Sequence, residues 1–238
     1  MEWHFRSEDG DLEMDLRFSM GTVTVLPDCI LPFSVFSMWE SMSTLEGTIR
    51  YKTDTHQVSG KMFYDYTRVS RPEISPTSLV TPREMYINTT MFFEDGSGMF
   101  GYHAEDLQGR PIEYYCFGVY VDREGKGHFL PEARLRDLRT DDDDLPAQWG
   151  LEWKNEDVRI TCGVTVERTD IVRSWGSPNA PRGRREFSIL PLVLNGSASI
   201  SESSGGSVNP EAPSEDRNSR TVDGYGLAEY FNKTLWFG

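Results

Sequence analysis

The 238-residue sequence predicts an all-β protein whose antiparallel strands form a sandwich or a barrel. Few stretches repeat at helical spacing, whereas short β-branched and aromatic runs recur between turn residues. Aromatic residues make up 12% of the chain and supply large side chains for a core. Residues 221–231 form an apolar stretch after a very polar one, which favours a barrel that this last strand completes.

Two hairpins are expected in the first part of the chain. Residues 3–6 and 12–18 flank an Asp-Gly turn, which is a typical hairpin connection. Residues 48–52 and 57–66 are strand-like and flank a second turn. Residues 33–40, between the two hairpins, alternate weakly, and we expect an extended or loop-like path there.

A consecutive, mostly up-and-down meander is expected in the middle of the chain. Its strands are predicted at residues 85–93, 99–104, 112–121 and 127–135. Residues 70–83, which precede the meander, are rich in Ser, Thr and Pro. We therefore expect a long connection that passes over the barrel mouth and acts as a lid.

Further strands and one long loop are predicted in the last third of the chain. The strands are expected at residues 149–153, 158–167, 186–194 and 198–200. Asn195-Gly196 is a strong signal for a two-residue hairpin turn. Residues 201–220 are rich in Ser, Gly, Pro, Asn and charge, and are predicted to form a mobile loop.

The charge balance limits the classes of partner. A formal net charge of −14 argues against nonspecific binding to nucleic acid, because a polyanion would be repelled. No apolar run approaches the roughly 18 residues of a membrane span. The run Asp141 to Asp144 is expected to be a solvated loop, and no calcium-loop spacing supports a metal there.

The three cysteines, Cys29, Cys116 and Cys162, are an odd number without close pairing. A disulfide framework is therefore not expected, and the thiols are interpreted as buried packing groups in a reducing compartment. A cytoplasmic location follows from this interpretation.

Two acids lie in otherwise aromatic strands and are the leading catalytic candidates. Asp65 follows Phe63 and Tyr64 and precedes Tyr66, although Asp is depleted in strands. Glu229 occupies a similar position in the closing strand. Paired carboxylates inside an apolar cavity would have raised pKa values, which would make one of them a proton donor near neutral pH. The alternative is that each acid faces solvent or binds an arginine.

His103 is the histidine of interest because it lies on a predicted strand beside Tyr102. We expect His103 and Tyr66 to orient a substrate. No spacing resembles a zinc site, a Gly-x-Ser-x-Gly elbow, a phosphate loop or a dinucleotide fingerprint. No cofactor and no metal are therefore expected.

Several other aromatic residues are read first as core or barrel lining, and second as the walls of a cavity for an apolar ligand. Together with one acid they are the predicted substrate-binding residues: Trp39, Glu40, Tyr102, Tyr115, Phe117, Trp149 and Trp175. Aromatic faces can also stabilise a cationic intermediate of a polyene or terpenoid.

An ordered series of weak motifs runs from a Val-x-Gly-x-x-x-x-Asp strand at Val58 to Asp65 to a Gly-x-Gly-x-x-Glu strand at Gly224 to Glu229. Between them stand Phe93 to Gly96, Pro146 to Trp149 and Trp175-Gly176. In this order the motifs resemble the lipocalin-like superfamily of carotenoid 1,2-hydratases (hydroxyneurosporene synthases), AttH-like proteins, kievitone hydratase and lipocalin-like Diels-Alderases.

The resemblance covers roughly residues 45 to 231 and implies an antiparallel lipocalin-like β-barrel that acts without metal or organic cofactor. Asp65 and Glu229 match the acids of the first and last motifs. The chain departs from the family after Asp65, where Tyr66 to Val69 replaces a common His-x-Trp-Gly run. Relatives are longer and have two lipocalin-like halves, so residues 1–44 are expected to be a reduced first half and residues 45–238 the barrel.

The resemblance implies an enzyme of natural-product biosynthesis. It would catalyse acid-base cyclisation, isomerisation, hydration or dehydration of a hydrophobic small molecule. The alternative is a non-catalytic lipocalin-type binding protein for an apolar ligand. A third interpretation, a structural or interaction module, would be favoured by a barrel interior filled with side chains. A homodimer is compatible with each of the three.

Overall fold

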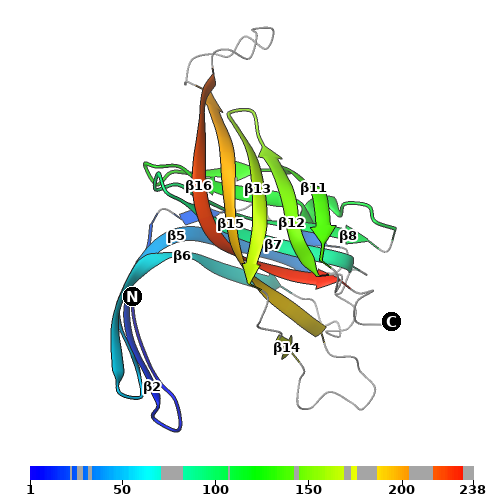
Figure 1. The fold of residues 1–238 in the computed structure, drawn as a ribbon. Coiled ribbons are helices and arrows are strands. Elements are labelled where there is room, and N and C mark those ends of the chain that lie inside the picture. Colours follow the sequence, from blue (N-terminus) through cyan, green and yellow to red (C-terminus); the bar gives the residue numbers. More distant parts are fainter. Residues whose placement is uncertain are drawn as a thin grey trace, which may run out of the picture. The chain divides into compact units, whose positions relative to one another are not determined.

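The computed structural model consists of β-strands and one short 3-10 helix, with no α-helix in the part of the chain that it describes (Figure 1). It describes residues 1–21, 23–25, 29–31, 34–70, 83–106, 108–141, 145–168, 173–175, 187–203 and 217–232. The predicted lid at residues 70–83 lies almost entirely outside these ranges, as do residues 204–216 of the predicted loop at 201–220. Residues 201–203 and 217–220 of that loop are strand instead, in β15 (Phe187–Ser203) and β16 (Arg217–Asn232).

The chain forms two compact units. The first contains residues 1–73 and 121–127, and the second contains residues 74–120 and 128–238. Residue 44, the expected end of the N-terminal part, lies inside a long strand of the first unit. The interpretation of the N-terminal strands as a reduced lipocalin-like half stays a prediction.

The first unit is built on a six-stranded sheet in which the fifth strand is central. Its strands are β1 (Glu2–Arg6), β2 (Leu12–Ser19), β3 (Val23–Val25), β4 (Cys29–Leu31), β5 (Ser34–Tyr51) and β6 (Asp54–Ser70). The path is β1-β2-β5-β3, and β4 and β6 also pair with β5. The turn between β1 and β2 contains Gly10 at φ 75°, which confirms the predicted Asp-Gly hairpin.

Of the two paths expected for residues 33–40, extended or loop-like, the structure shows the extended one, because β5 begins at Ser34. Its first half pairs with β6 on one side and with β3 and β4 on the other. Hydrogen bonding on both sides holds this segment extended despite its weak alternation.

The second unit contains a ten-stranded antiparallel sheet. Its elements are β7 (Arg83–Phe93), β8 (Gly98–Asp106), the 3-10 helix η2 (Glu113–Tyr115), β9 (Phe117–Val121), β10 (Gly127–Leu130), β11 (Glu132–Thr140), β12 (Pro146–Lys154), β13 (Val158–Arg168), β14 (Arg173–Trp175), β15 (Phe187–Ser203) and β16 (Arg217–Asn232). The path is β10-β9-β8-β7-β16-β15-β13-β12-β11, with β14 beside β15.

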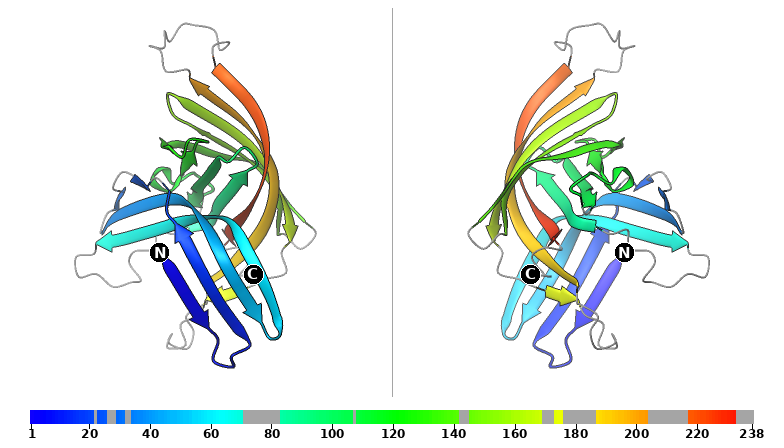
Figure 2. Two further views of the ribbon diagram at one scale, coloured as in Figure 1. Left: turned by 90° about the vertical axis from the view of Figure 1, so that its left-hand side faces the viewer. Right: turned by 90° about the vertical axis from the view of Figure 1, so that its right-hand side faces the viewer.

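This path begins at β10 and ends at β11, and Pro131 alone connects these two strands in the sequence. The sheet therefore curls into a nearly closed barrel, whose strong curvature Figure 2 shows. The last strand, β16, pairs with both β15 and β7. The predicted all-β, lipocalin-like barrel and its closing strand are confirmed.

One continuous cluster of apolar side chains fills the concave side of this sheet. Its largest buried members are Trp149, Trp153, Tyr120, Ile87, Met91, Met99, Leu130, Leu151, Ile160, Leu192, Leu194 and Ile200. Each such side chain stabilises the fold by about 1.5–3 kcal/mol relative to exposure. Trp153 lies against Gly101 and Gly118, where an added Cβ would lie 2.8 and 2.5 Å from its ring atoms.

The predicted hairpin at Asn195-Gly196 is wrong, because β15 continues through both residues to Ser203. The strand pairs with β16 and β13 along this stretch. A Cβ on Gly196 would lie only 2.4 Å from the carbonyl oxygen of Gly163. Glycine is therefore required here by the close approach of β13, and not by a turn.

Among the described residues, no helix is long and apolar enough to span a membrane.

Candidate functional site

Four of the predicted site residues lie in the first unit, where their strands are described but their side chains are not. Asp65 and Tyr66 belong to β6, and Trp39 and Glu40 belong to β5. In the register of these two strands, Asp65 is the partner of Glu40 and Tyr66 is the partner of Trp39. The register therefore brings a second acid opposite Asp65, a relationship that sequence spacing did not reveal.

Other predictions also fall outside the described part of the chain. Trp175 ends β14 opposite Phe187, and its side chain is not described. Residues 142–144 of the acidic run also lie outside the described part of the chain. Cys29 is described only by its backbone, in β4.

Glu229 is exposed and lies on the outer face of β16. Its neighbours Ala228 and Tyr230 are buried in the core of the second unit. Side chains alternate between the two faces of a strand, so Glu229 and these neighbours point in opposite directions. The expectation that the closing strand directs Glu229 into the barrel interior therefore does not hold.

His103 lies on the inner face of β8, and only 3% of its surface is exposed. Tyr230, Ile87 and His103 are successive partners across β16, β7 and β8. His103 Nε2 lies 3.1 Å from Glu105 Oε1, and His103 Nδ1 lies 3.5 Å from Cys116 Sγ. The imidazole is thus held between a carboxylate and a thiol.

The hydrogen-bonding capacities of Glu105, His103 and Cys116 determine which atom of each pair carries the hydrogen. An ionised Glu105 only accepts hydrogen bonds, so Nε2 of His103 carries a hydrogen and Nδ1 presents a lone pair. Burial raises the pKa of the Cys116 thiol, and this effect outweighs the hydrogen bond to the Ala104 carbonyl. Cys116 is therefore a thiol near neutral pH, and its hydrogen is shared between Nδ1 and the Ala104 oxygen.

Glu105 and Cys116 are the residues of this cluster that the sequence analysis did not select, and the thiols were interpreted only as packing groups. The expectation that the thiols are buried is correct for Cys116 and Cys162, which are both free cysteines in buried positions. For Cys162, burial raises the pKa to about 12. The turn at η2 places Cys116 beside His103, thirteen residues away.

The predicted aromatic lining is divided between the two faces of the barrel. Trp149 lies in the core and is 1% exposed. Tyr102 is half-buried and alternates with His103, so it lies on the outer face of β8. Its ring centroid is 5.4 Å from that of Phe117. Tyr115, in η2, is half-buried. These residues do not line one common surface.

Three hydrogen-bond donors on the inner face have no partner within the described residues. They are Nε1 of Trp149, Nε1 of Trp153 and the hydroxyl of Thr89. Leaving such a buried donor unsatisfied costs about 1–3 kcal/mol. A water or ligand oxygen beside them would remove this cost.

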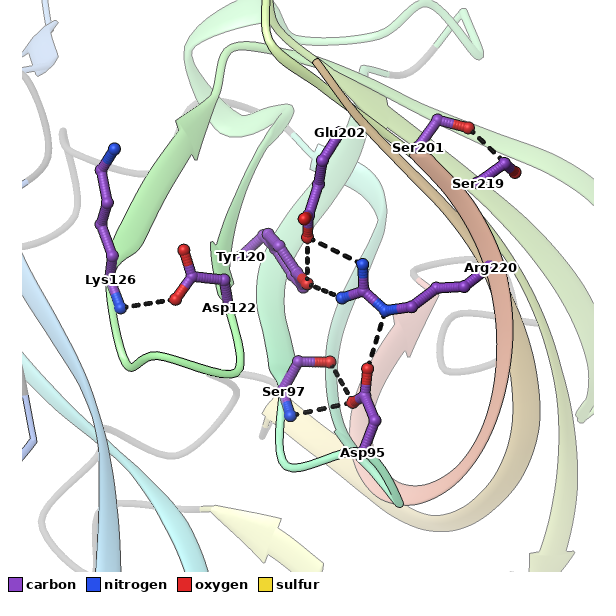
Figure 3. A network of polar contacts seen from close by, with 9 residues as sticks. All are labelled: Asp95, Ser97, Tyr120, Asp122, Lys126, Ser201, Glu202, Ser219 and Arg220. Carbon is purple, nitrogen blue, oxygen red and sulfur yellow. Dashed lines mark hydrogen bonds and ion pairs between the residues drawn. The ribbon is translucent and has the colours of Figure 1, made fainter. Parts of the chain in front are cut away.

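A second polar cluster lies in the barrel at the start of β16, ten positions before Tyr230 (Figure 3). Arg220 Nε donates to Asp95 Oδ2 over 2.9 Å, and Arg220 NH1 lies 3.1 Å from Glu202 Oε1. Tyr120 donates its hydroxyl hydrogen to Glu202 over 2.8 Å and accepts one from Arg220 over 2.5 Å. Ser97 donates to Asp95 over 2.6 Å.

Arg220 contacts both carboxylates of this second cluster, Asp95 and Glu202. Partial burial acts to raise the pKa of Asp95, but the hydrogen bonds from Ser97 and Arg220 outweigh it, and the pKa lies below its ordinary value. Burial and the hydrogen bond donated to Glu202 raise the pKa of Tyr120. The cluster consists of satisfied partners, and we interpret it as a structural connection between strands.

An open groove of about 550 Å³ lies on the sheet of the first unit. Its lining residues are Glu2, His4, Asp15, Leu16, Arg17, Glu46, Gly47, Gln57, Val58 and Ser59. Most of these side chains are polar, unlike the walls expected for an apolar substrate. Within the described chain, no group of three or more His, Cys, Asp or Glu residues could hold a metal ion.

The barrel and its strand order define the second unit as a lipocalin-like protein fold. Searches with the sequence gave no match to a protein-family model and no match among curated proteins. Solved structures do match. An AttH-like protein of Nitrosomonas europaea aligns with a TM-score of 0.53 at 12% identity, over 96% of this chain and 67% of its own.

CghA, solved with Sch210972, aligns with a TM-score of 0.53 at 11% identity, over 95% of this chain and 63% of its own. CghA solved alone aligns with a TM-score of 0.52 at 10% identity and is covered over 62%. The chain thus spans about two thirds of the length of these structures. At such identities the likeness shows a shared fold, and this is the fold implied by the resemblance to the AttH-like and Diels-Alderase superfamily.

Proposed function

We propose that this protein is a cofactor-independent, lipocalin-like enzyme of natural-product biosynthesis. It binds a hydrophobic small molecule and catalyses its cyclisation, isomerisation, hydration or dehydration by acid-base chemistry. The shared fold with an AttH-like protein and with CghA supports the class of protein. Sch210972, with which CghA was solved, supports a small organic molecule as the ligand class.

The observation that carries the proposal is the buried His103 between Glu105 and Cys116. A histidine whose tautomer is set by a carboxylate can act as a general base, and Nδ1 of His103 presents its lone pair when the Cys116 hydrogen is donated to the Ala104 oxygen. In this proposal His103 moves a proton at Nδ1, and Glu105 stabilises the imidazolium that forms. The apolar core around it excludes water, which strengthens both interactions.

Acid chemistry is proposed separately for the first unit. Asp65 is the proposed proton donor there, and its register partner Glu40 is the proposed acid-base partner. Glu229, the partner expected from the sequence, is exposed on the outer face of β16.

The unpartnered Nε1 groups of Trp149 and Trp153 fit a ligand that carries an oxygen acceptor on an otherwise apolar skeleton. A carbonyl or hydroxyl of a terpenoid or polyketide-like substrate would accept from them. The location of this enzyme is expected to be cytoplasmic, and cell fractionation would test that separately.

The experiment is a comparison of metabolites in cells with and without the gene, followed by complementation with variants. The wild type and His56→Gln, a change at an exposed histidine, are expected to restore the missing product. His103→Gln is expected to accumulate its precursor while its far-ultraviolet circular dichroism and thermal midpoint remain those of a folded protein. An unchanged metabolite profile, or full restoration by His103→Gln, would refute the proposal.

Acid variants test the carboxyl pair separately. Asp65→Asn is expected to reduce turnover by about 100-fold, the usual contribution of a general acid. If Asp65→Asn and Glu229→Gln both kept full turnover, the acid-base assignment would be wrong.

A lipocalin-type binding protein is the second candidate, and the continuous packed core also keeps a structural module open. A binding protein would retain its ligand unchanged, would tolerate loss of both acids and would lose affinity on Trp149→Phe. A structural module would change no metabolite and would bind none of the precursor.

A further inference from the structure

The strand β1 has a free edge. It pairs with β2 on one side, and no strand of the described chain pairs with its other side. Met1 and Ser7 bond to the backbone of Phe18 and Leu12. Because bonding directions alternate along a strand, the N–H and C=O groups of Glu2, His4 and Arg6 point outward from the sheet. Figure 2 shows β1 in the darkest blue at the border of its sheet.

We propose that this edge pairs with β1 of a second copy of the chain, antiparallel about a two-fold axis at His4. This register places Glu2 opposite Arg6 of the other copy, His4 opposite its own counterpart, and Trp3 opposite Phe5. The three outward residues then form the hydrogen-bonded pairs of the ladder. Trp3 and Phe5 fall in the non-hydrogen-bonded pairs, where side chains approach more closely.

The charged face of the sheet supports this register. Within one copy, Glu2 is paired with Arg17 over 3.2 Å, and Glu13 with Arg50 over 2.7 Å. Glu13 is also the strand partner of Arg6. Across the joined sheet the row becomes Glu46, Arg17, Glu2, then Arg6, Glu13 and Arg50 of the second copy. Charges alternate at every step of this row, which favours the pairing.

The opposite face contributes apolar surface. Trp3 is 46% exposed and Phe5 is 39% exposed, and their ring centroids lie 6.0 Å apart. Pairing would bring each Trp3 beside Phe5 of the other copy and reduce both exposures. Such aromatic pairs across strands are favourable.

Other registers are less favourable for electrostatic reasons. A parallel arrangement would place Glu2 beside Glu2 and Arg6 beside Arg6. An antiparallel register shifted by two residues is also less favourable. A shift in one direction would place His4 opposite Arg6, and a shift in the other direction would leave Arg6 without a partner. Only the register centred on His4 pairs all three outward residues and both opposite charges. The two facing His4 side chains are its one like pair, and each lies beside Asp15 of its own copy.

The test is sedimentation velocity of the full chain from about 2 to 500 µM, a range suited to interfaces smaller than about 1,200 Å². The 27.2 kDa chain is expected to sediment as a monomer at the low end and as a dimer at the high end. Glu2→Arg alone and Arg6→Glu alone each create two like-charge contacts and are expected to weaken dimerisation at least tenfold.

Mixing these two variants in equal amounts is expected to restore the dimer, because residue 2 of one then opposes a residue 6 of opposite charge in the other. Glu124→Arg, which makes the same charge change at an exposed turn outside this row, is the matched control and is expected to dimerise like the wild type. Mixing distinguishes weakened pairing at the β1 edge from a folding defect, because mixing does not repair a misfolded chain.

A wild-type chain that stays monomeric to 500 µM, about the upper limit for a weak specific interface, would overturn the proposal. So would single variants that dimerise as the wild type does, or a mixture that remains monomeric. None of these outcomes depends on an enzymatic activity.

Discussion

Arg220 and Asp95 are 125 residues apart in the sequence, and yet the Nε hydrogen of Arg220 is donated to Asp95 Oδ2 over 2.9 Å. The contact joins the start of β16 to the turn between β7 and β8. Both side chains are largely buried, with 20% and 17% of their surface exposed. The pair therefore connects the closing strand to the rest of the barrel.

Replacing Arg220 with methionine is expected to lower the free energy of unfolding by about 2 kcal/mol, because Asp95 and Glu202 would lose their shared partner in a partly buried place. Urea unfolding followed by tryptophan fluorescence would measure the change. Arg123→Met, at an exposed turn, is the control and should change the free energy by less than about 0.5 kcal/mol. Equal effects of the two substitutions would contradict a structural role for the cluster.

The same cluster predicts a pH dependence of stability. The pKa of Asp95 is lowered in the folded state from 3.8, so its contribution is complete above that value and is lost as the pH falls through the folded pKa. The stability difference between the wild type and Asp95→Asn should therefore be largest near neutral pH and shrink below about pH 4. Urea titrations at several pH values would show this, with Asp157→Asn as the exposed control. A difference that grew toward acid pH would be inconsistent with the lowered pKa.

Gly118→Ala is expected to destabilise the barrel by about 2–3 kcal/mol, since the new methyl group would overlap the fully buried ring of Trp153. Gly163→Ala is the matched control, because nothing lies within 4 Å of its Cβ position. Thermal unfolding of both variants would measure the contrast. If both alanines were tolerated equally, Trp153 would not be packed on Gly118.

The His103 cluster can be tested without a substrate. We expect His103 to carry its hydrogen on Nε2 and to keep Nδ1 unprotonated, because Glu105 accepts from Nε2. Long-range proton–nitrogen correlation spectra of ¹⁵N-labelled protein report the tautomer directly. Glu105→Leu should release this preference, whereas Glu113→Leu, at the neighbouring 3-10 helix, should leave it unchanged. A predominant Nδ1-H form in the wild type would exclude the proposed role of Nδ1 as a base.

His4 should titrate above its ordinary pKa of 6.5, because Asp15 accepts a hydrogen bond from it and stabilises the imidazolium. Asp15→Asn should return the midpoint toward 6.5. Proton chemical shifts of the His4 ring across pH 5 to 9, roughly the span in which histidines titrate, would measure both midpoints. The exposed His56 is an internal reference. Identical midpoints for His4 in the two proteins would show that Asp15 has no influence.

Much of the strand order was predictable because it depends on local patterns. The Asp-Gly turn before β2 and the strands β7, β8 and β9 are encoded by turn residues and alternation within a few positions. The single strand expected at residues 127–135 is wrong, because it is divided at Pro131 into β10 and β11, and residues 113–115 of the strand expected at 112–121 form a 3-10 helix. Asn195-Gly196 shows the limit of this reasoning. The dipeptide is a turn signal by itself, but its glycine is used for the approach of Gly163 on β13.

The candidate site likewise contains residues that local sequence patterns predicted and residues that they did not. His103 was predicted because it lies on a strand whose neighbours could line a pocket, and the structure buries it beside Glu105. The contribution of Cys116 and the pairing of Arg220 with Asp95 depend on which strands become neighbours. No residue spacing in the sequence predicts which strands become neighbours.

The all-β class, the return of the last strand to the barrel and the selection of Asp65 and His103 as candidates follow from the amino-acid pattern. The outward direction of Glu229, the place of Glu40 opposite Asp65 and the thiol beside His103 depend on how the strands pair. Strand register explains this difference. A shift of one residue moves every side chain to the other face of a sheet, and pairing across distant strands sets that register.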